Sequence, residues 1–323
     1  GKGEVNGNTS VTLQGGARAG FVIGANSATF NGAYMFGHGV REASMTGDAA
    51  IKLSGSAQAG LVIGAGYAES SSGSPIIGDG TTTGRTEQDL NNAAISTMTG
   101  DTSITVEGNT SVDILAGAGN AWSDTRYFID NALKQTQVAD ATLTGNASST
   151  MTGGSVTLWA LGGYAQGFGN ASVTGNVEGL MTGGTATTVV VGGLAGVETT
   201  ADLNYDSNSK KASTLATSTS AGTAAVSGDA SFTAEGGTLG TVWLGSAEYG
   251  SDQPLTAAAE ASKVSGVASL TITGDTNLTN ARVVRGAAAT TELVFGTTET
   301  AWNGTFSNFE GIDQLAVAGG SSL

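Results

Sequence analysis

The stretch Thr46-Gly47-Asp48-Ala49-Ala50-Ile51-Lys52 is the clearest copy of a phrase that recurs along this chain of 323 residues. Its first three residues return as Thr99-Gly100-Asp101, Thr144-Gly145-Asn146, Thr174-Gly175-Asn176, Ser227-Gly228-Asp229 and Thr273-Gly274-Asp275, with Asn6-Gly7-Asn8 at the front. A second glycine follows after eight residues in six of the seven copies, as Gly15, Gly55, Gly108, Gly153, Gly183 and Gly236. A third follows nine residues later, as Gly24, Gly64, Gly117, Gly162, Gly192 and Gly245. Fixed offsets of this kind indicate a stacked repeat architecture.

The segments between these glycines have the pattern of short β-strands. In the second copy, Ile51 and Leu53 alternate with Lys52, and an apolar run at 61–63 stops at Gly64. Period-two alternation bounded by glycine turns is typical of strands. Glycine adopts positive φ without steric cost, and Asp48 tolerates the same region and bonds its own backbone in a turn. Three strands and three corners per repeat predict an all-β fold, a right-handed parallel β-helix whose equivalent residues stack about 4.8 Å apart.

We expect one domain over residues 1–323, with regular repeats at 5–286 and less regular coils at 287–323. Arg282 stands at the second glycine position of the seventh copy, which breaks the pattern. The apolar position of Ile51 holds Ser149 in the fourth copy and Gly179 in the fifth. The core should therefore be thinner at those two coils. Each repeat of a solenoid contacts only its neighbours, so length adds coils to a single domain.

The number of residues between the third glycine of one repeat and the first of the next varies from copy to copy. The shortest connection lies between Gly162 and Gly175. Every longer one is an insertion, and all of them should leave the helix at the same corner and line one side. Variable loops on one face of a regular scaffold are where binding functions usually lie.

Composition limits the partners and the chemistry. Twelve basic residues against 27 acidic ones give a net charge of −15, which disfavours nucleic acid and anionic lipid surfaces as partners. The absence of cysteine excludes disulfides, thiolate metal sites and cysteine nucleophiles. No run of 18 or more apolar residues exists, so we expect no direct membrane insertion of this segment. The chain has neither an initiator Met nor a basic-then-apolar leader, and we expect it to be a fragment of a longer protein.

The last thirty residues carry a family resemblance. Trp302-Asn303-Gly304, then Phe306-Ser307-Asn308-Phe309-Glu310, precede Leu315-Ala316-Val317 and a Gly-Gly-Ser-Ser-Leu end. Together with the glycine-, threonine- and asparagine-rich coils, this pattern resembles the passenger domain of a bacterial autotransporter, a pectin-lyase-like β-helix of adhesin type. The resemblance implies an extracellular location on the bacterial surface, a translocating barrel beyond the C-terminus, and adhesion, self-association or a structural stalk as the function. Its partners would be a host-surface protein or glycan, or a second copy.

Three kinds of polar site receive weak support from the sequence. The Asp and Asn residues of the first corner do not form the nonapeptide pattern of calcium coils, and a calcium site would not tolerate so many Asn substitutes. His38 is the one histidine, and no Gly-x-Ser-x-Gly context accompanies it. The glycine pairs lack a following Lys-Ser/Thr, which disfavours a phosphate loop. We therefore expect no metal, no cofactor and no catalytic residue.

The alternative function is a polysaccharide-cleaving β-helix enzyme with a carboxylate site in the insertions. The acids available there are Asp124, Asp130, Asp202, Asp206, Glu248 and Asp252. Asp202 and Asp206 are closest to a pair, and two carboxylates beside a sugar act as acid and base. A solvated acidic loop explains the same pair more simply.

Aromatic residues gather just past the third glycine or inside the insertions. The candidate partner-binding residues are Tyr34, Phe36, Trp122, Tyr127, Phe128, Tyr164, Phe168 and Tyr205, with Tyr67 and Tyr249 in similar places. Stacked along one edge they would grip sugars or protein, because aromatic faces bind both. Packing of the insertions onto the helix is the competing interpretation.

Overall fold

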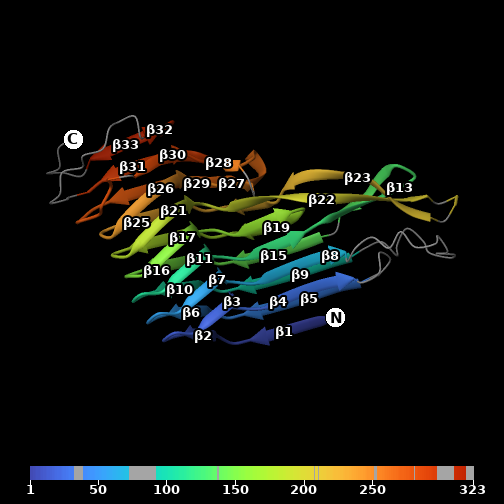
Figure 1. Ribbon diagram of the computed structural model, residues 1–323, viewed down its shortest axis with the longest axis horizontal. Helices are drawn as coiled ribbons and strands as arrows, with labels where there is room; N and C mark the ends of the chain where they lie inside the picture. Colours follow the sequence, from blue (N-terminus) through green and yellow to red (C-terminus); the bar gives the residue numbers. More distant parts are fainter. Residues whose placement is uncertain are drawn as a thin grey trace.

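The computed structural model describes residues 1–32, 39–72, 92–136, 138–206, 208, 209, 211–250, 253–279, 281–296 and 309–317. The chain winds into a parallel β-helix, as the glycine spacing predicts, and its coils stack in chain order from the N-terminal to the C-terminal end (Figure 1). Each coil contributes strands to three sheets, called sheets A, B and C here. The strands of successive coils pair in parallel register, so the residues of these strands have counterparts one coil away.

Sheet A consists of two stacks that meet at a bend. The first stack contains β1 (Lys2–Asn6), β5 (Gly39–Thr46), β9 (Asn92–Thr99), β15 (Val138–Thr144), β19 (Gly169–Val173) and β24 (Thr223–Val226). The second contains β2 (Thr9–Leu13), β6 (Ala49–Leu53), β10 (Thr102–Val106), β16 (Ala147–Met151), β20 (Val177–Met181) and β25 (Ala230–Ala234). The long strands β29 (Val264–Ile272) and β31 (Ala288–Phe295) join the two stacks, and β33 (Gln314–Val317) follows.

Sheets B and C complete each coil. Sheet B contains β3 (Arg18–Ile23), β7 (Gln58–Ile63), β11 (Ser111–Ala116), β17 (Ser155–Ala160), β21 (Thr185–Val191), β26 (Thr238–Leu244), β30 (Arg282–Arg285) and β32 (Phe309–Glu310). Sheet C contains β4 (Ser27–Gly32), β8 (Tyr67–Ser72), β12 (Asn120–Ser123), β18 (Tyr164–Gly167) and the start of β22 (Leu194–Asp206). A coil therefore has four strands, where the sequence pattern indicates three. The short sheet C strand escapes the apolar pattern because its inward residues are alanines.

The Thr-Gly-Asp/Asn phrase forms the bend between the two stacks of sheet A, called corner 1. We number the coils from its glycine: coils 1 to 3 begin at Gly7, Gly47 and Gly100, and coils 4 to 6 at Gly145, Gly175 and Gly228. The sequence predicts that the corner-1 side chains bond their own backbone, and this prediction is wrong: they bond the backbone of the next coil. The Oδ1 atoms of Asn8, Asp48, Asp101, Asn146, Asn176 and Asp229 each accept the backbone N–H of the equivalent residue one coil on, at 2.8–3.0 Å. Asn serves as well as Asp because only an acceptor oxygen is needed.

The second and third glycines change register between coils 3 and 4. Corner 2, which leads into sheet B, spans residues 54–57 in coil 2 but only 152–154 in coil 4. Its left-handed glycine is Gly55 or Gly108 in the early coils (φ 72° and 71°) and Gly154 in coil 4 (φ 81°), so Gly153 is in the turn but is not the left-handed residue. The sheet B pairing then places Leu161, and not Gly162, level with Gly117.

The seventh copy of the phrase is a wrong assignment. Ala230 of β25 pairs with Ala268 of β29, so Gly266 is the residue level with Gly228. Gly274 lies one corner later, where its Cβ would meet the carbonyl of Glu235. Arg282 pairs with Thr241 in sheet B and is not at a glycine position at all. Corner 1 has straightened into the continuous strand β29 at this coil, and the phrase 273–275 occurs in corner 2.

Two of the apolar clusters formed by the described residues lie in the helix interior. The larger runs along sheets A and B from Val22 to Phe295, and the smaller is a column of alanines between sheet C and the first stack of sheet A. The core is not thinner at Ser149 and Gly179, contrary to expectation. Trp159 reaches across and donates its indole N–H to Ser149 Oγ at 2.8 Å, and the ring of Phe232 lies edge-on to it at 5.1 Å.

Gly179 leaves room for these large neighbours, because a Cβ there would lie 2.5 Å from Phe232 and 2.7 Å from Leu161. Small residues on one wall are thus matched by large ones on the other. No helix among the described residues has the length and apolar character to span a membrane.

Candidate binding surface on the insertion side

The insertions leave the helix at one corner, the one between sheet C and the first stack of sheet A. Among the described residues, three of them are hairpins: β13 (Thr125–Ile129) with β14 (Ala132–Thr136), β22 with β23 (Lys211–Ala221), and β27 (Ala247–Gly250) with β28 (Gln253–Ala257). Figure 1 shows β13, β22 and β23 projecting to one side of the stacked coils. The expectation of one-sided insertions is confirmed. The insertions after β4 and β8, with Tyr34, Phe36 and His38, lie outside the described residues, as does Asp252.

Coil 4 shows the corner without an insertion. β18 ends at Gly167, which has a φ of 62°, and β19 begins at Gly169 after a single residue, Phe168. The backbone N–H of Phe168 donates to the carbonyl of Ser123 one coil below, at 2.8 Å. The helix therefore closes this corner without a hairpin, and the hairpins are additions to a complete coil.

Local turn chemistry fixes the hairpin tips. Asp130 and Asn131 both have positive φ, 49° and 64°, as a two-residue hairpin turn requires. Asp206 accepts the backbone N–H groups of Asn208 and Ser209 at 2.8 and 3.2 Å, which is an Asx-type turn. The carboxylate of Asp206 is therefore engaged in its own turn, and the pair with Asp202 considered above does not act as a unit.

Asp202 fastens two hairpins to each other. Arg126 of β13 donates from Nε and Nη2 to its two carboxylate oxygens, at 2.8 and 2.9 Å, and Asp202 is only 6% exposed. The same guanidinium lies 4.8 Å from the ring centre of Phe168 and 5.9 Å from that of Phe128. A bidentate, stacked arginine holds its partners in fixed geometry. Phe128 and Phe168, candidate binding residues from the sequence, thus pack the hairpins onto the helix.

The outer face of sheet C presents a row of aromatic and polar side chains. Trp122 is half-buried, and its strand register places it between Glu69 of coil 2 and Gln166 of coil 4. Gln166 donates to Glu198 at 2.9 Å, and the Tyr67 hydroxyl donates to Glu69 at 2.7 Å. This row, Tyr67, Glu69, Trp122, Tyr164, Gln166 and Glu198, is called the sheet C row below.

Burial shapes the electrostatics of the row. The pKa of Tyr164, which is 3% exposed, is raised by desolvation and then by the charges of Glu198 and Tyr249. Desolvation and the nearby Asp124 also raise the pKa of Glu198 above its ordinary value. The pKa of Tyr67 is raised by desolvation and by its hydrogen bond to Glu69. The surface is acidic, and each of its tyrosines keeps its proton at neutral pH.

The structure distributes the predicted aromatic residues over several roles. Trp122 and Tyr164 belong to the sheet C row, and Tyr249 is 37% exposed on the neighbouring strand β27. Tyr127 and Tyr205 lie on the paired strands β13 and β22, and their side chains are outside the described part. Sequence reasoning missed Glu69, Gln166 and Glu198, whose proximity follows only from the coil-to-coil register. In the described ranges, no three His, Cys, Asp or Glu side chains form a cluster suited to a metal ion.

Comparison of the chain with protein-family models, with curated proteins and with solved structures gives no match.

Proposed function

We propose that this chain is the passenger segment of a bacterial surface protein of the autotransporter kind, which acts outside the cell as an adhesin or self-associating stalk. The observation that carries the proposal is the separation of scaffold from hairpins. In the part of the chain that the structure describes, three hairpins project from one corner, while coil 4 closes the same corner with Phe168 alone. Surfaces that vary on a constant scaffold are typical of recognition.

The composition supports an extracellular stalk. A chain without cysteine forms no disulfide while it crosses an oxidising compartment unfolded, and a net charge of −15 opposes nonspecific collapse onto anionic surfaces. The hydrogen bonds of corner 1 and the apolar core both continue from coil to coil, so coils stack into an elongated fold in which each coil contacts its neighbours.

The structure dictates how to remove the hairpins. Register places Ser123 level with Gly167 and Val138 level with Phe168, so deleting residues 124–137 joins two positions that are already sequential in coil 4. Deleting 198–220 joins Val197 to Ala221 at the same place in coil 5. Both deletions belong in one variant, because Arg126 and Asp202 would otherwise lose each other and leave a buried charge.

The test displays residues 1–323 on a non-adherent bacterial strain and counts cells retained on an epithelial monolayer and cells in clumps. We expect display of the natural chain to raise one of the two counts, and the double deletion to return it to the level of the undisplayed strain. Circular dichroism of the purified variants checks that the β-helix is retained. Neither adhesion nor clumping by the natural chain, or full activity of a folded double deletion, would contradict the proposal.

A second candidate function is cleavage of a polysaccharide at Glu198. The observation in its favour is that desolvation, and then the charge of Asp124, raise the pKa of this carboxyl, since glycoside hydrolysis uses one protonated and one ionised carboxyl. Reducing-end release from neutral and acidic polysaccharides, lost in Glu198→Gln, would support it. No release by the natural chain from any polysaccharide tested would remove it.

A further inference from the structure

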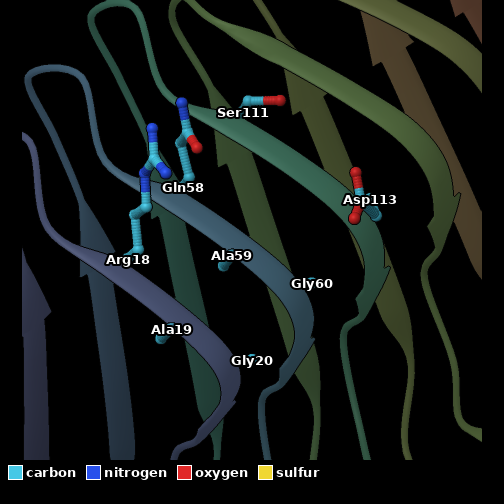
Figure 2. A pocket seen from close by; sticks show the side chains of 8 residues that line it. All are labelled: Arg18, Ala19, Gly20, Gln58, Ala59, Gly60, Ser111 and Asp113. Carbon is cyan, nitrogen blue, oxygen red and sulfur yellow. The ribbon is translucent and has the colours of Figure 1, made fainter.

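An open hollow of about 400 Å³ lies on the outer face of sheet B, across the first three coils and away from the hairpins. Its lining comes from three neighbouring strands: Arg18, Ala19 and Gly20 of β3, Gln58, Ala59 and Gly60 of β7, and Ser111 and Asp113 of β11. Figure 2 shows Arg18, Gln58 and Ser111 grouped near the start of the three strands, with Gly20, Gly60 and Asp113 two residues farther along β3, β7 and β11.

The hollow exists because two adjacent coils have glycine at the same outward position. Gly20 and Gly60 stand where coils 3, 4 and 5 carry Asp113, Thr157 and Thr187, all level with one another in sheet B. Gly60 cannot carry a side chain, because a Cβ there would lie 2.9 Å from the carbonyl oxygen of Gly20. A Cβ on Gly20 would meet nothing within 4 Å. The floor of the hollow is therefore bare backbone, with a side chain sterically excluded at Gly60.

Positively charged, negatively charged and neutral polar side chains surround this floor. Among the described residues, the side chains of Arg18, Gln58 and Asp113 have no hydrogen-bond or ion-pair partner, and all three are exposed. Their donors and acceptors are planar groups, namely a guanidinium, an amide and a carboxylate, each able to make two parallel hydrogen bonds. One positive and one negative charge cancel, so the hollow favours a neutral ligand that offers many hydroxyls.

An exposed aromatic residue comes directly after the lining residues of β3, although it does not itself line the hollow. Phe21 follows Gly20 on β3 and is 60% exposed, the highest fraction among the large hydrophobic side chains of the described residues. Its ring lies 6.0 Å from that of Tyr67, edge-on, so Tyr67 supports it from the sheet C side. Exposed aromatic rings beside convergent polar groups mark sites for ligands that have one apolar face and a polar rim.

We propose that this hollow binds a neutral saccharide, with a pyranose ring packed on Phe21 and its hydroxyl groups hydrogen-bonded to Arg18, Gln58 and Asp113. The net charge of −15 disfavours acidic glycans at the same place. The proposal does not rest on the proposed function, because the hollow lies on sheet B and uses no residue of the hairpins.

Later coils supply the test variant. Gly20→Thr introduces the side chain that Thr157 and Thr187 carry at the equivalent position, and its Cβ enters the hollow without a backbone clash. Phe21→Ala removes the ring. Thr157→Ala, at the same position in coil 4, is the matched control.

The labelled chain and its three variants are applied to an array of neutral and acidic oligosaccharides, and the dissociation constant for the strongest neutral oligosaccharide is measured by calorimetry. We expect Gly20→Thr and Phe21→Ala each to weaken binding at least about tenfold, and Thr157→Ala to change it less than about twofold. A melting temperature confirms folding, and Arg18→Ala with Asp113→Ala replaces Gly20→Thr if that variant unfolds. Binding to no neutral glycan, binding to acidic glycans alone, or unchanged affinity in the filled or polar-deleted variant would overturn the proposal.

Discussion

Coils 1–3 and coils 4–6 have the same glycine spacing but place those glycines differently. In the early coils, corner 3 between sheets B and C reads Gly64-Ala65-Gly66 or Gly117-Ala118-Gly119, and the alanine faces the core. In coil 4, the first of the later coils, corner 3 reads Leu161-Gly162-Gly163, and the leucine faces the core. Corner 2 is one residue shorter there, and the glycine of corner 3 comes one residue later. One change removes a residue between the second and third glycines and the other adds one, so the glycine spacing in the sequence stays the same.

The glycine spacing therefore reports only the number of residues between glycines. Which residues of neighbouring coils pair with each other depends instead on the volume of the side chains in the core. Leucine or valine at 161, 191 and 244 fills space that alanine leaves to other groups in the early coils. On the opposite wall of the core, sheet A has the small residues Ser149 and Gly179. In sheet B, Trp159 occupies the position that Leu115 has in coil 3. An interior packed to crystal density admits such exchanges only when total volume is kept.

The largest effect should come from putting a side chain on a corner-3 glycine of the early coils. In Gly117→Ala the new Cβ would lie 2.2 Å from the carbonyl oxygen of Leu161, which is backbone and cannot turn aside. We expect a loss of about 4 kcal/mol or more in the free energy of unfolding. Denaturant titration followed by circular dichroism measures it. Gly16→Ala, whose Cβ meets nothing within 4 Å, is the control and should cost about 0.5 kcal/mol or less. A small effect of Gly117→Ala would show that residue 117 does not lie against the backbone of Leu161.

A double-mutant cycle tests the exchange of volume between the two halves. Ser149→Ile with Trp159→Leu recreates the pair that coil 3 has in Ile104 and Leu115. Each single change should cost about 2–4 kcal/mol, because it either leaves a cavity and a lone hydroxyl or overpacks the indole and strips its acceptor. The double variant should recover at least about 1 kcal/mol of the summed cost. Additive costs would show that the two positions do not compensate each other.

The smallest expected effect on the free energy of unfolding tests which copies of the Thr-Gly-Asp/Asn phrase lie in corner 1. Asn176→Ala removes the acceptor of the Asp229 N–H, a 2.9 Å bond, and should lower the free energy of unfolding by about 1 kcal/mol. Asp275→Ala alters the Thr-Gly-Asp copy that lies in corner 2, and should change it by about 0.5 kcal/mol or less. Equal losses in the two variants, measured by the same denaturant titration, would restore the assignment of 273–275 to corner 1.

The sequence sufficed for the fold class, the one-sided insertions and the corner-1 glycines of coils 1–6, because each depends on a strong local signal. Gly47 and Gly100 need positive φ, and glycine supplies it wherever the corner recurs. The change of register between coils 3 and 4 could not be predicted from the sequence. Gly153 and Gly162 keep the expected spacing, although the residues next to them take the positions in the turns that the earlier glycines have. The sheet C strands were hidden as well, because their inward alanines do not produce an apolar run.

The candidate sites depended still more on stacking. Trp122 and Tyr164 follow a corner glycine and were accessible to sequence reasoning. The contact between Gln166 and Glu198 joins different coils, and so does the guanidinium of Arg126 over Phe168. The hollow on sheet B follows from two glycines, Gly20 and Gly60, that become neighbours only when coils 1 and 2 are placed in register.

Disulfide trapping tests the register change most directly, because the chain has no cysteine of its own. The Oγ atoms of Ser111 and Ser155 lie 3.5 Å apart on adjacent strands of sheet B, whereas counting from Gly108 and Gly153 would pair Ser111 with Val156. Under mild oxidation we expect Ser111→Cys with Ser155→Cys to form an intramolecular disulfide, and Ser111→Cys with Val156→Cys to stay reduced, because Val156 is buried in the core. Cross-linking of the second pair and not the first would contradict the register that this account describes.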